Sequence, residues 1–114
     1  MISLLQLVNE AKQVGTLYHS TNADNLISIL KSNVLKKNQS DAAMQFTDKI
    51  SFTRDKNYRP GEYTIEIDGN KLSNNYKTTP FAYYQGEREE SEEVVDRDIE
   101  NIKKYITNIY ANID

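Results

Sequence analysis

The sequence predicts a small α+β fold, in which helices near the N-terminus pack on a sheet of short strands. Two segments early in the chain carry apolar residues at helical spacing. Later segments are shorter and alternate apolar with polar residues, which is typical of half-buried strands. With 114 residues the chain has the length of one domain with one core. Because only 38% of the residues are hydrophobic, we expect the eight tyrosines to contribute to that core.

The first helix is predicted near the N-terminus, over residues 2–15. Ser3 is available as its N-cap, and Gly15 ends the apolar pattern. We expect this helix to pack on the sheet as scaffold. Its apolar residues are Ile2, Leu4, Leu5, Leu7, Val8 and Ala11.

The next segment, residues 14–19, predicts a strand that ends at the chain's only histidine. Side chains alternate along a strand, so Leu17 and His19 share one face and Tyr18 lies on the other. A lone histidine beside an apolar run is often a structural residue. It is also a residue that can bind a polar ligand, and this segment alone leaves both interpretations open.

A second helix is predicted over residues 21–33, with Thr21 or Asn22 as its cap. Its apolar stripe consists of Leu26, Ile27, Ile29 and Leu30. His19 would then lie beside the helix N-terminus, where free backbone N–H groups and the positive end of the dipole favour an anionic or hydroxyl-rich ligand.

The middle of the chain combines a polar loop with two strands. Residues 36–49 have few periodic apolar residues and predict a variable loop or lid. Residues 50–54 alternate as a strand that carries Ser51 and Thr53 on one face. Residues 63–68 give the clearest strand pattern and end at an Asp-Gly-Asn turn signal.

The last third of the chain contains an aromatic cluster at residues 81–84 and an acidic run at residues 87–93. The pair Val94-Val95 predicts a brief strand directly after this acidic run. A carboxylate at the start of a strand is held rigidly, so it can stabilise a positively charged transition state. Residues 98–114 fit both a helical and a strand pattern, so the sequence leaves their structure open.

Composition excludes several kinds of site. The chain has no cysteine, so disulfides, thiolate metal sites and thiol nucleophiles are excluded. With a single histidine, a zinc cluster is not expected. The net charge of −3 disfavours general nucleic-acid binding, which depends on Lys and Arg. No signal-type segment or membrane span is recognisable, so we expect a cytoplasmic protein with no membrane partner.

Three motifs follow one another in an order that resembles the ADP-ribosyltransferase-like superfamily. The first is Leu-Tyr-His-Ser-Thr at residues 17–21, followed by the helix pattern Asn-Leu-Ile-Ser-Ile-Leu at residues 25–30. The second is Ile-Ser-Phe-Thr-Arg-Asp at residues 50–55, and the third is the carboxylate pair before Val94-Val95. The resemblance covers residues 14–110 and implies a small split β-sheet around a cleft that binds NAD as substrate, without a metal.

The resemblance implies the following residue roles. His19 would hydrogen-bond the ribose hydroxyls of NAD, and Ser20 or Thr21 would contact the nucleotide nearby. Ser51 and Thr53 would shape the nicotinamide pocket and hold the catalytic glutamate. The middle motif has no tyrosine for stacking, so that aromatic ring would come from Tyr58 or Tyr84.

The catalytic glutamate implied by the resemblance lies in the acidic run. The family's Glu-x-Glu element matches Glu90-Ser91-Glu92, while Ser91-Glu92-Glu93 aligns equally well. We prefer Glu92 and keep Glu93 as the alternative; if a strand has begun, the two point to opposite faces. The glutamate would stabilise an oxocarbenium-like ribose as nicotinamide leaves. A substrate-recognition loop would contain Tyr83, Tyr84, Gln85 and Glu90.

Two phosphate chemistries match parts of the same pattern less well. His19-Ser20-Thr21 resembles one half of the paired His-x-Thr site of 2H phosphoesterases, but that mechanism needs two histidines. A tRNA 2′-phosphotransferase-like site normally uses several arginines, and this chain has four in all: Arg54, Arg59, Arg88 and Arg97.

The resemblance therefore implies a mono-ADP-ribosyltransferase that uses NAD to modify a protein or, less in keeping with the net charge of the chain, a nucleic acid. Short family members are common among bacteriophage proteins, and some act on host defence systems. The resemblance thus implies a phage-encoded protein that acts on host machinery in the host cytoplasm. The alternative is a binding or inhibitory module on the same fold, which occludes a partner protein through an acidic, tyrosine-rich surface.

Overall fold

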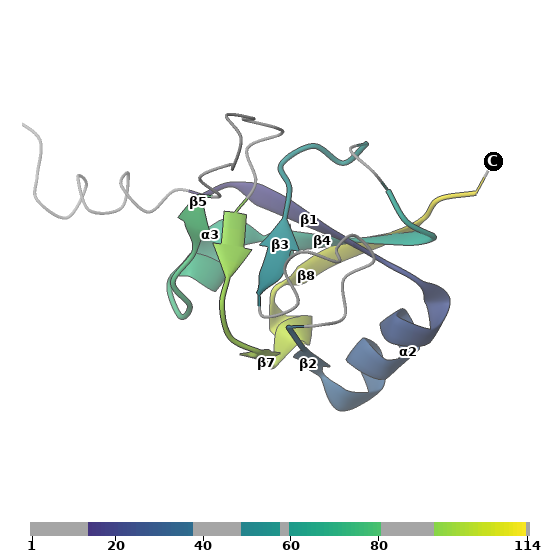
Figure 1. Ribbon diagram of the computed structural model, residues 1–114, viewed down its shortest axis with the longest axis horizontal. Coiled ribbons are helices and arrows are strands. Elements are labelled where there is room, and N and C mark those ends of the chain that lie inside the picture. Colours follow the sequence, from purple (N-terminus) through teal and green to yellow (C-terminus); the bar gives the residue numbers. More distant parts are fainter. Residues whose placement is uncertain (1–13, 38–48, 58–59, 81–92, 114) are drawn as a thin grey trace, which may run out of the picture.

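An antiparallel sheet of three strands, in the order β1-β4-β8, runs through the middle of the molecule (Figure 1). Its strands are β1 (Thr16–Thr21), β4 (Tyr63–Asp68) and β8 (Ile106–Ala111). The structure is a computed structural model and describes residues 14–37, 49–57, 60–80 and 93–113. Within β1 and β4 the register pairs His19 with Ile65, so both side chains face the core.

A second antiparallel sheet, in the order β3-β6-β5, continues the first beyond β1. Its strands are β3 (Ile50–Phe52), β6 (Glu93–Val95) and β5 (Thr79–Pro80). The two sheets meet where Tyr18 and Thr53 exchange backbone hydrogen bonds of 2.8 and 3.0 Å. Strands β1 and β3 are therefore neighbours, and the side chains of both sheets form one continuous face toward the core.

Helix α2 (Ala23–Ser32) follows β1 directly and packs its buried residues Leu26 and Ile29 into the core. It begins where the Asn22 side chain accepts a hydrogen bond of 2.8 Å from the Asn25 N–H group. It ends at Asn33, whose φ of 61° is left-handed and stops the helix. A short helix, α3 (Gly69–Ser73), begins in the same way with Asp68 as its cap.

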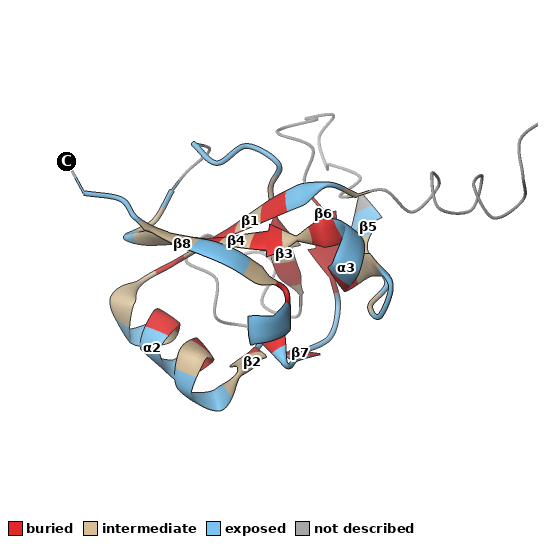
Figure 2. Ribbon diagram, turned by 180° about the vertical axis from the view of Figure 1, so that it is seen from behind, coloured by how far each residue is buried: buried red, intermediate tan, exposed pale blue. Residues whose placement is uncertain are grey.

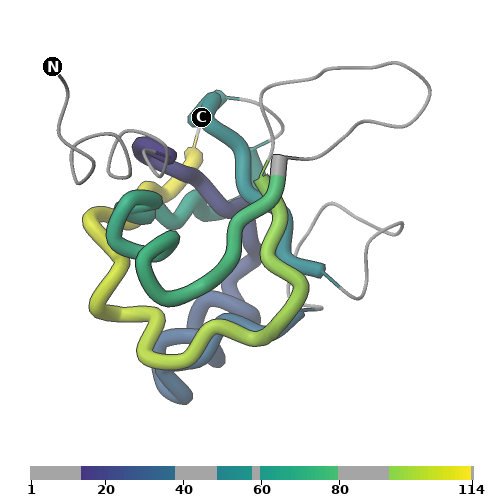
Figure 3. Tube along the Cα trace, turned by 90° about the vertical axis from the view of Figure 1, so that its left-hand side faces the viewer, coloured from purple at the N-terminus to yellow at the C-terminus, as the bar shows by residue number. Residues whose placement is uncertain are grey.

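The C-terminal segment passes around the lower part of the molecule before it returns to the first sheet (Figure 3). Strand β7 (Ile99–Glu100) pairs with β2 (Val34–Leu35), which follows α2. A 3₁₀ turn over Ile102–Lys104 then leads into β8. These elements close the core from below, since Ile99, Ile102 and Tyr105 are all buried in it.

The core lies between the joined sheets and the elements α2, α3, β2 and β7. Figure 2 shows the buried parts of β1, β3 and β6 next to one another in the middle of the molecule. The largest fully buried side chains include Tyr105, Phe52 and, as a polar member, His19. The other buried apolar residues of this core cluster are Leu17, Leu26, Ile29, Leu35, Ile50, Ile65, Ile67, Leu72, Val95, Ile99 and Ile102.

The predicted α+β class is confirmed, and the strand at residues 63–68 has the bounds that its alternation predicts. The open question at residues 98–114 is answered by strands β7 and β8 with a 3₁₀ turn between them. The expected turn at residues 68–70 is instead the start of α3, because Asp68 accepts the Lys71 N–H bond as an N-cap. The predicted helix at residues 2–15 and the loop at residues 36–49 fall largely outside the described residues.

Candidate functional site

His19, Phe52 and Glu93 form a row across three neighbouring strands, on the core face of the joined sheets. Phe52 and Glu93 are register partners in β3 and β6. Tyr18 in β1 pairs with Thr53, just after β3, in an antiparallel bridge. One step along this register, His19 lies opposite Phe52. Two strand spacings, about 10 Å, therefore separate the backbones of His19 and Glu93. We call these three residues the central row.

The imidazole of His19 is held by the neighbouring strand β3. Its Nδ1 atom lies 3.1 Å from the backbone carbonyl oxygen of Ser51. A carbonyl oxygen only accepts, so Nδ1 carries the proton, and in the neutral ring Nε2 is an acceptor. The ring lies 5.6 Å from the ring of Phe52, centroid to centroid, and His19 is only 1% exposed.

Glu93 begins β6 and is buried, with 4% of its surface exposed. Its Oε2 atom accepts a bond of 2.9 Å from Nη2 of Arg54, a residue that lies two positions after Phe52 and so on the same face. The Nε–H group of Arg54 donates to the carbonyl of Val14, at 3.0 Å. Arg54 therefore joins the start of β6 to the residues that lead into β1.

The N-terminus of α2 lies further from His19 than the sequence predicts, because β1 continues through Thr21. Two of its N–H groups are already bonded within the protein. The Ala23 N–H donates to Glu62 at 2.8 Å, and the Asn25 N–H donates to Asn22. The expected ligand seat at the helix start is thus occupied by the chain's own side chains.

Ser20, Thr21, Ser51 and Thr53 were the other predicted nucleotide contacts among the described residues. Thr21 is buried on the face of His19, whereas Ser20 alternates to the opposite face with Tyr18. Ser51 and Thr53 likewise alternate with Phe52, and their side chains project away from the central row. Ser51 reaches His19 through its backbone carbonyl, and Thr53 accepts the Asp55 N–H through Oγ1 at 3.1 Å.

Six of the predicted site residues lie outside the described part of the chain. They comprise the preferred catalytic residue and the proposed aromatic and substrate-loop residues: Glu92, Tyr58, Tyr83, Tyr84, Gln85 and Glu90. Glu93, the alternative candidate for the catalytic glutamate, is described and lies in the central row.

The resemblance gives no role to Arg54 and places Phe52 only within the Ser51-Phe52-Thr53 wall of the cleft, although both residues belong to the Ile-Ser-Phe-Thr-Arg motif. The strand period groups Phe52 with Arg54 and separates them from Ser51 and Thr53. Strand alternation in this motif is therefore the sequence signal that points to Phe52 and Arg54 as residues of one face.

A second polar cluster lies on the outer face of the first sheet, around Glu66. This carboxylate accepts bonds from Thr107 Oγ1 at 2.7 Å and from the Tyr110 hydroxyl at 3.0 Å. Burial, followed by the charge of Glu66, raises the pKa of Tyr18 above its usual 10.0. The hydrogen bond to Glu66 is the main cause that raises the pKa of Tyr110. Both hydroxyls are therefore neutral donors at physiological pH.

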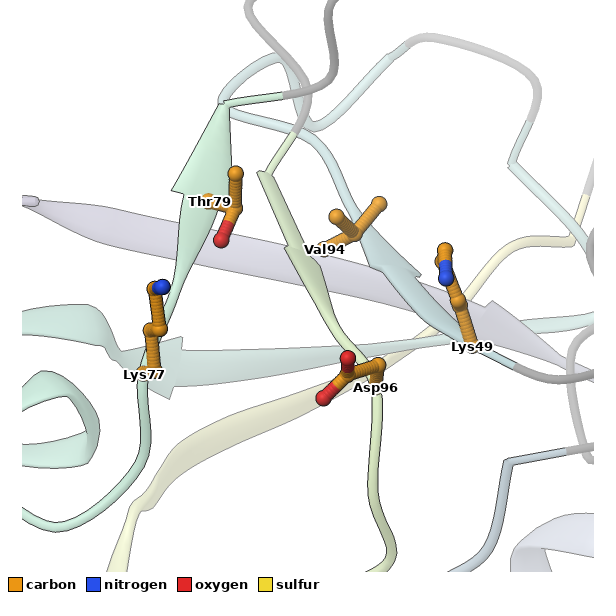
Figure 4. Close-up of a pocket in the computed structure, with 5 residues that line it drawn as sticks. All are labelled: Lys49, Lys77, Thr79, Val94 and Asp96. Atoms are coloured by element: carbon orange, nitrogen blue, oxygen red, sulfur yellow. The ribbon is translucent and has the colours of Figure 1, made fainter.

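A shallow pocket of about 190 Å³ lies on the outer face of the second sheet (Figure 4). Val94 lies between Lys49 on one side and Thr79 and Lys77 on the other, with Asp96 next to it. Because Val94 follows Glu93 in β6, the pocket faces away from the central row. The register places Asp96 between the two lysines, where alternating charges stabilise paired strands.

Within the described ranges, no group of three or more His, Asp or Glu side chains is arranged to hold a metal ion. No helix in the same part of the chain is long and apolar enough to cross a membrane. Comparisons with known protein families, with curated proteins and with solved structures find no match for this chain. The candidate site therefore depends on its geometry alone.

The central row offers three distinct chemical groups side by side. His19 provides an acceptor nitrogen in a fixed tautomer, which suits a hydroxyl donor such as a ribose hydroxyl. Phe52 provides an apolar ring between the two polar residues. Glu93 provides a carboxylate in a poorly solvated setting, where it interacts strongly with positive charge.

Proposed function

We propose that this chain is an NAD-dependent mono-ADP-ribosyltransferase with a split sheet of the ADP-ribosyltransferase-like kind. The observation that carries the proposal is the central row, in which a buried imidazole and a buried carboxylate come from separate strands and face the same way. Two small antiparallel sheets joined at the bridge between Tyr18 and Thr53 also support a split-sheet fold. The order of His19, the Phe52 strand and Glu93 along the chain agrees with the order of the family's motifs.

In this proposal the two polar residues of the central row, His19 and Glu93, each have one task. Nε2 of His19 accepts a hydrogen bond from a ribose hydroxyl of NAD and fixes the sugar. The Glu93 carboxylate stabilises the positive charge that develops on the ribose as the bond to nicotinamide breaks and its electron pair leaves with nicotinamide. The acceptor is a nucleophilic group of a protein target, which bonds to the same ribose carbon and loses a proton to solvent. The net charge of −3 favours a protein over a nucleic acid.

The test measures nicotinamide release from NAD, together with transfer of labelled ADP-ribose to proteins of a cell lysate. The wild-type chain should release nicotinamide and label a protein. Replacing Glu93 by Gln keeps the shape of the side chain but removes its charge, so we expect the rate to fall by about 100-fold or more. His19→Ala should also lower the rate, because the ribose loses a positioning contact.

Two matched variants make this test specific. Glu100→Gln makes the same change at an exposed residue of β7 and should leave the rate unchanged. Glu92→Gln changes the neighbouring carboxylate. If Glu92→Gln abolishes release and Glu93→Gln does not, the role assigned to Glu93 is wrong. If the wild-type chain neither releases nicotinamide nor transfers label, the proposed activity is wrong.

A non-catalytic binding module is the second candidate, and the burial of the central row favours it. His19 is 1% exposed and Glu93 is 4% exposed. Such burial is typical of structural polar residues whose hydrogen-bond partners lie within the same protein. A ligand that binds the folded state raises the melting temperature by mass action. The binding module therefore predicts no change in melting temperature with NAD, whereas the transferase predicts a rise that grows with NAD concentration.

A further inference from the structure

We propose that Arg54 is the positioning residue for Glu93 and sets the separation between Glu93 and His19. This inference rests on the proposed function. It extends that function to a residue for which the family resemblance provided no role.

The contacts of Arg54 connect the two strands that carry the polar ends of the central row. Nη2 contacts Oε2 of Glu93 in β6 at 2.9 Å, while Nε–H contacts the carbonyl of Val14 at 3.0 Å. Val14 lies two residues before β1, the strand that carries His19. One guanidinium thus ties the strand of the carboxylate to the segment that leads to the imidazole.

Glu93 is buried more deeply than Arg54, so the carboxylate depends on this contact more than the guanidinium does. The Glu93 side chain is 6% exposed, so water cannot replace a lost partner easily. The Arg54 side chain is 37% exposed, so it remains partly in contact with solvent. Among the described residues, Arg54 is the side chain that contacts the Glu93 carboxylate. It therefore determines where the carboxylate points.

An arginine suits this task and a lysine does not. The guanidinium is planar and donates from Nε and Nη2 in fixed directions, so it can hold a carbonyl and a carboxylate together. The ammonium group of lysine is a point charge on a flexible stem. Lysine would keep the positive charge near Glu93 but lose the fixed geometry. The hydroxyls of Ser51 and Thr53 cannot substitute, because they project from the opposite face.

The test compares Arg54→Lys with the wild-type chain in nicotinamide release from NAD. If the carboxylate is displaced by about 1 Å, kcat should fall by about 100-fold while KM changes little. Arg97→Lys is the matched control, since Arg97 lies over the ring of Tyr76, away from the central row, and should keep the wild-type rate. An unchanged kcat for Arg54→Lys in a folded protein would overturn the inference.

A second measurement separates this inference from the proposed function. Arg54→Gln, Glu93→Gln and the double variant are compared by melting temperature, with no NAD present. If Arg54 holds Glu93, the double variant loses less than the sum of the two single losses. Additive losses contradict the inference whether or not the chain cleaves NAD. An inactive wild-type chain with non-additive losses removes the proposed function and leaves the Arg54 contact as a structural one.

Discussion

Arg54 and His19 each use a backbone carbonyl as a hydrogen-bond partner. Arg54 binds the carbonyl of Val14, and His19 binds the carbonyl of Ser51. The Ser51 carbonyl belongs to strand β3 and the Val14 carbonyl lies two residues before β1, so both partners are backbone groups and limit how the two side chains can turn. This fixed orientation is what a site needs when it must align a sugar and a carboxylate.

The sequence identified His19 and the acidic residues before Val94 as candidates, and the structure brings His19 and Glu93 into one row. The role of Ser51 and Thr53 could not be predicted in the same way. Alternation shows that the two hydroxyls share a face of β3, but it cannot show which face of β1 they join. The pairing of Tyr18 with Thr53 decides this, and such a pairing depends on tertiary structure.

Tyr18 makes the stability of the fold sensitive to alkaline pH. Its pKa is raised above 10.0 in the folded protein, mainly by burial and then by Glu66. The unfolded chain therefore loses this proton first as the pH rises. Between pH 10.0 and the folded pKa, unfolding releases this proton, so the free energy of unfolding falls as the pH rises. Below pH 10.0 the contribution of Tyr18 to stability is complete.

The measurement is urea unfolding of the wild-type chain and of Tyr18→Phe, at a series of pH values on both sides of 10.0. The wild-type chain should lose more stability than Tyr18→Phe as the pH increases through the window. Equal slopes for the wild-type chain and Tyr18→Phe would contradict the account of this cluster.

At the scale of the elements, α3 and β1 approach each other through two glycines. The Gly69 N–H group donates to the Gly15 carbonyl at 2.8 Å, which joins the start of α3 to the residue before β1. A Cβ atom at Gly69 would overlap this carbonyl and press on the side chain of Leu17. The turn signal at residues 68–70 thus reflects a close approach of two backbone segments, which a single sequence does not reveal.

Gly69→Ala should destabilise the protein by about 1 to 3 kcal/mol, because the backbone must move to relieve the overlap. Gly15→Ala is the comparison. A Cβ there meets open space, but the φ of +87° costs an L-residue about 1 kcal/mol. Urea unfolding should rank Gly69→Ala as the less stable variant. If Gly69→Ala unfolds at the same urea concentration as the wild-type chain, Gly69 and the Gly15 carbonyl do not lie as close together as in the structure.

The C-terminal residues show where local pattern stops being informative. Isoleucines at residues 99, 102, 106, 109 and 113 have helical spacing, whereas residues 105, 107, 109, 111 and 113 alternate as in a strand. Residues 106–111 form a strand because they pair with β4. Strand β1 covers one edge of β4, and β8 supplies the hydrogen bonds at the other edge. Residues 63–68 needed no such context, since their alternation matches a strand that is half buried.

At the scale of the whole molecule, the two sheets meet in the described part of the chain through one bridged pair, Tyr18 with Thr53. The central row crosses this junction, with His19 on one side and Phe52 and Glu93 on the other. Any movement of one sheet against the other would change the distance between the imidazole and the carboxylate. The contacts of Arg54 and of His19 both span the same junction, so they link the geometry of the site to the packing of the sheets.

The most direct test of the proposed site uses the fact that His19 is the only histidine in the chain. Its imidazole gives one set of NMR signals, which can be followed while NAD is added. The account predicts a saturable shift of the His19 ring signals with NAD, at the concentrations that also raise the melting temperature. Ring signals that stay unchanged as NAD is raised to millimolar concentration would contradict it.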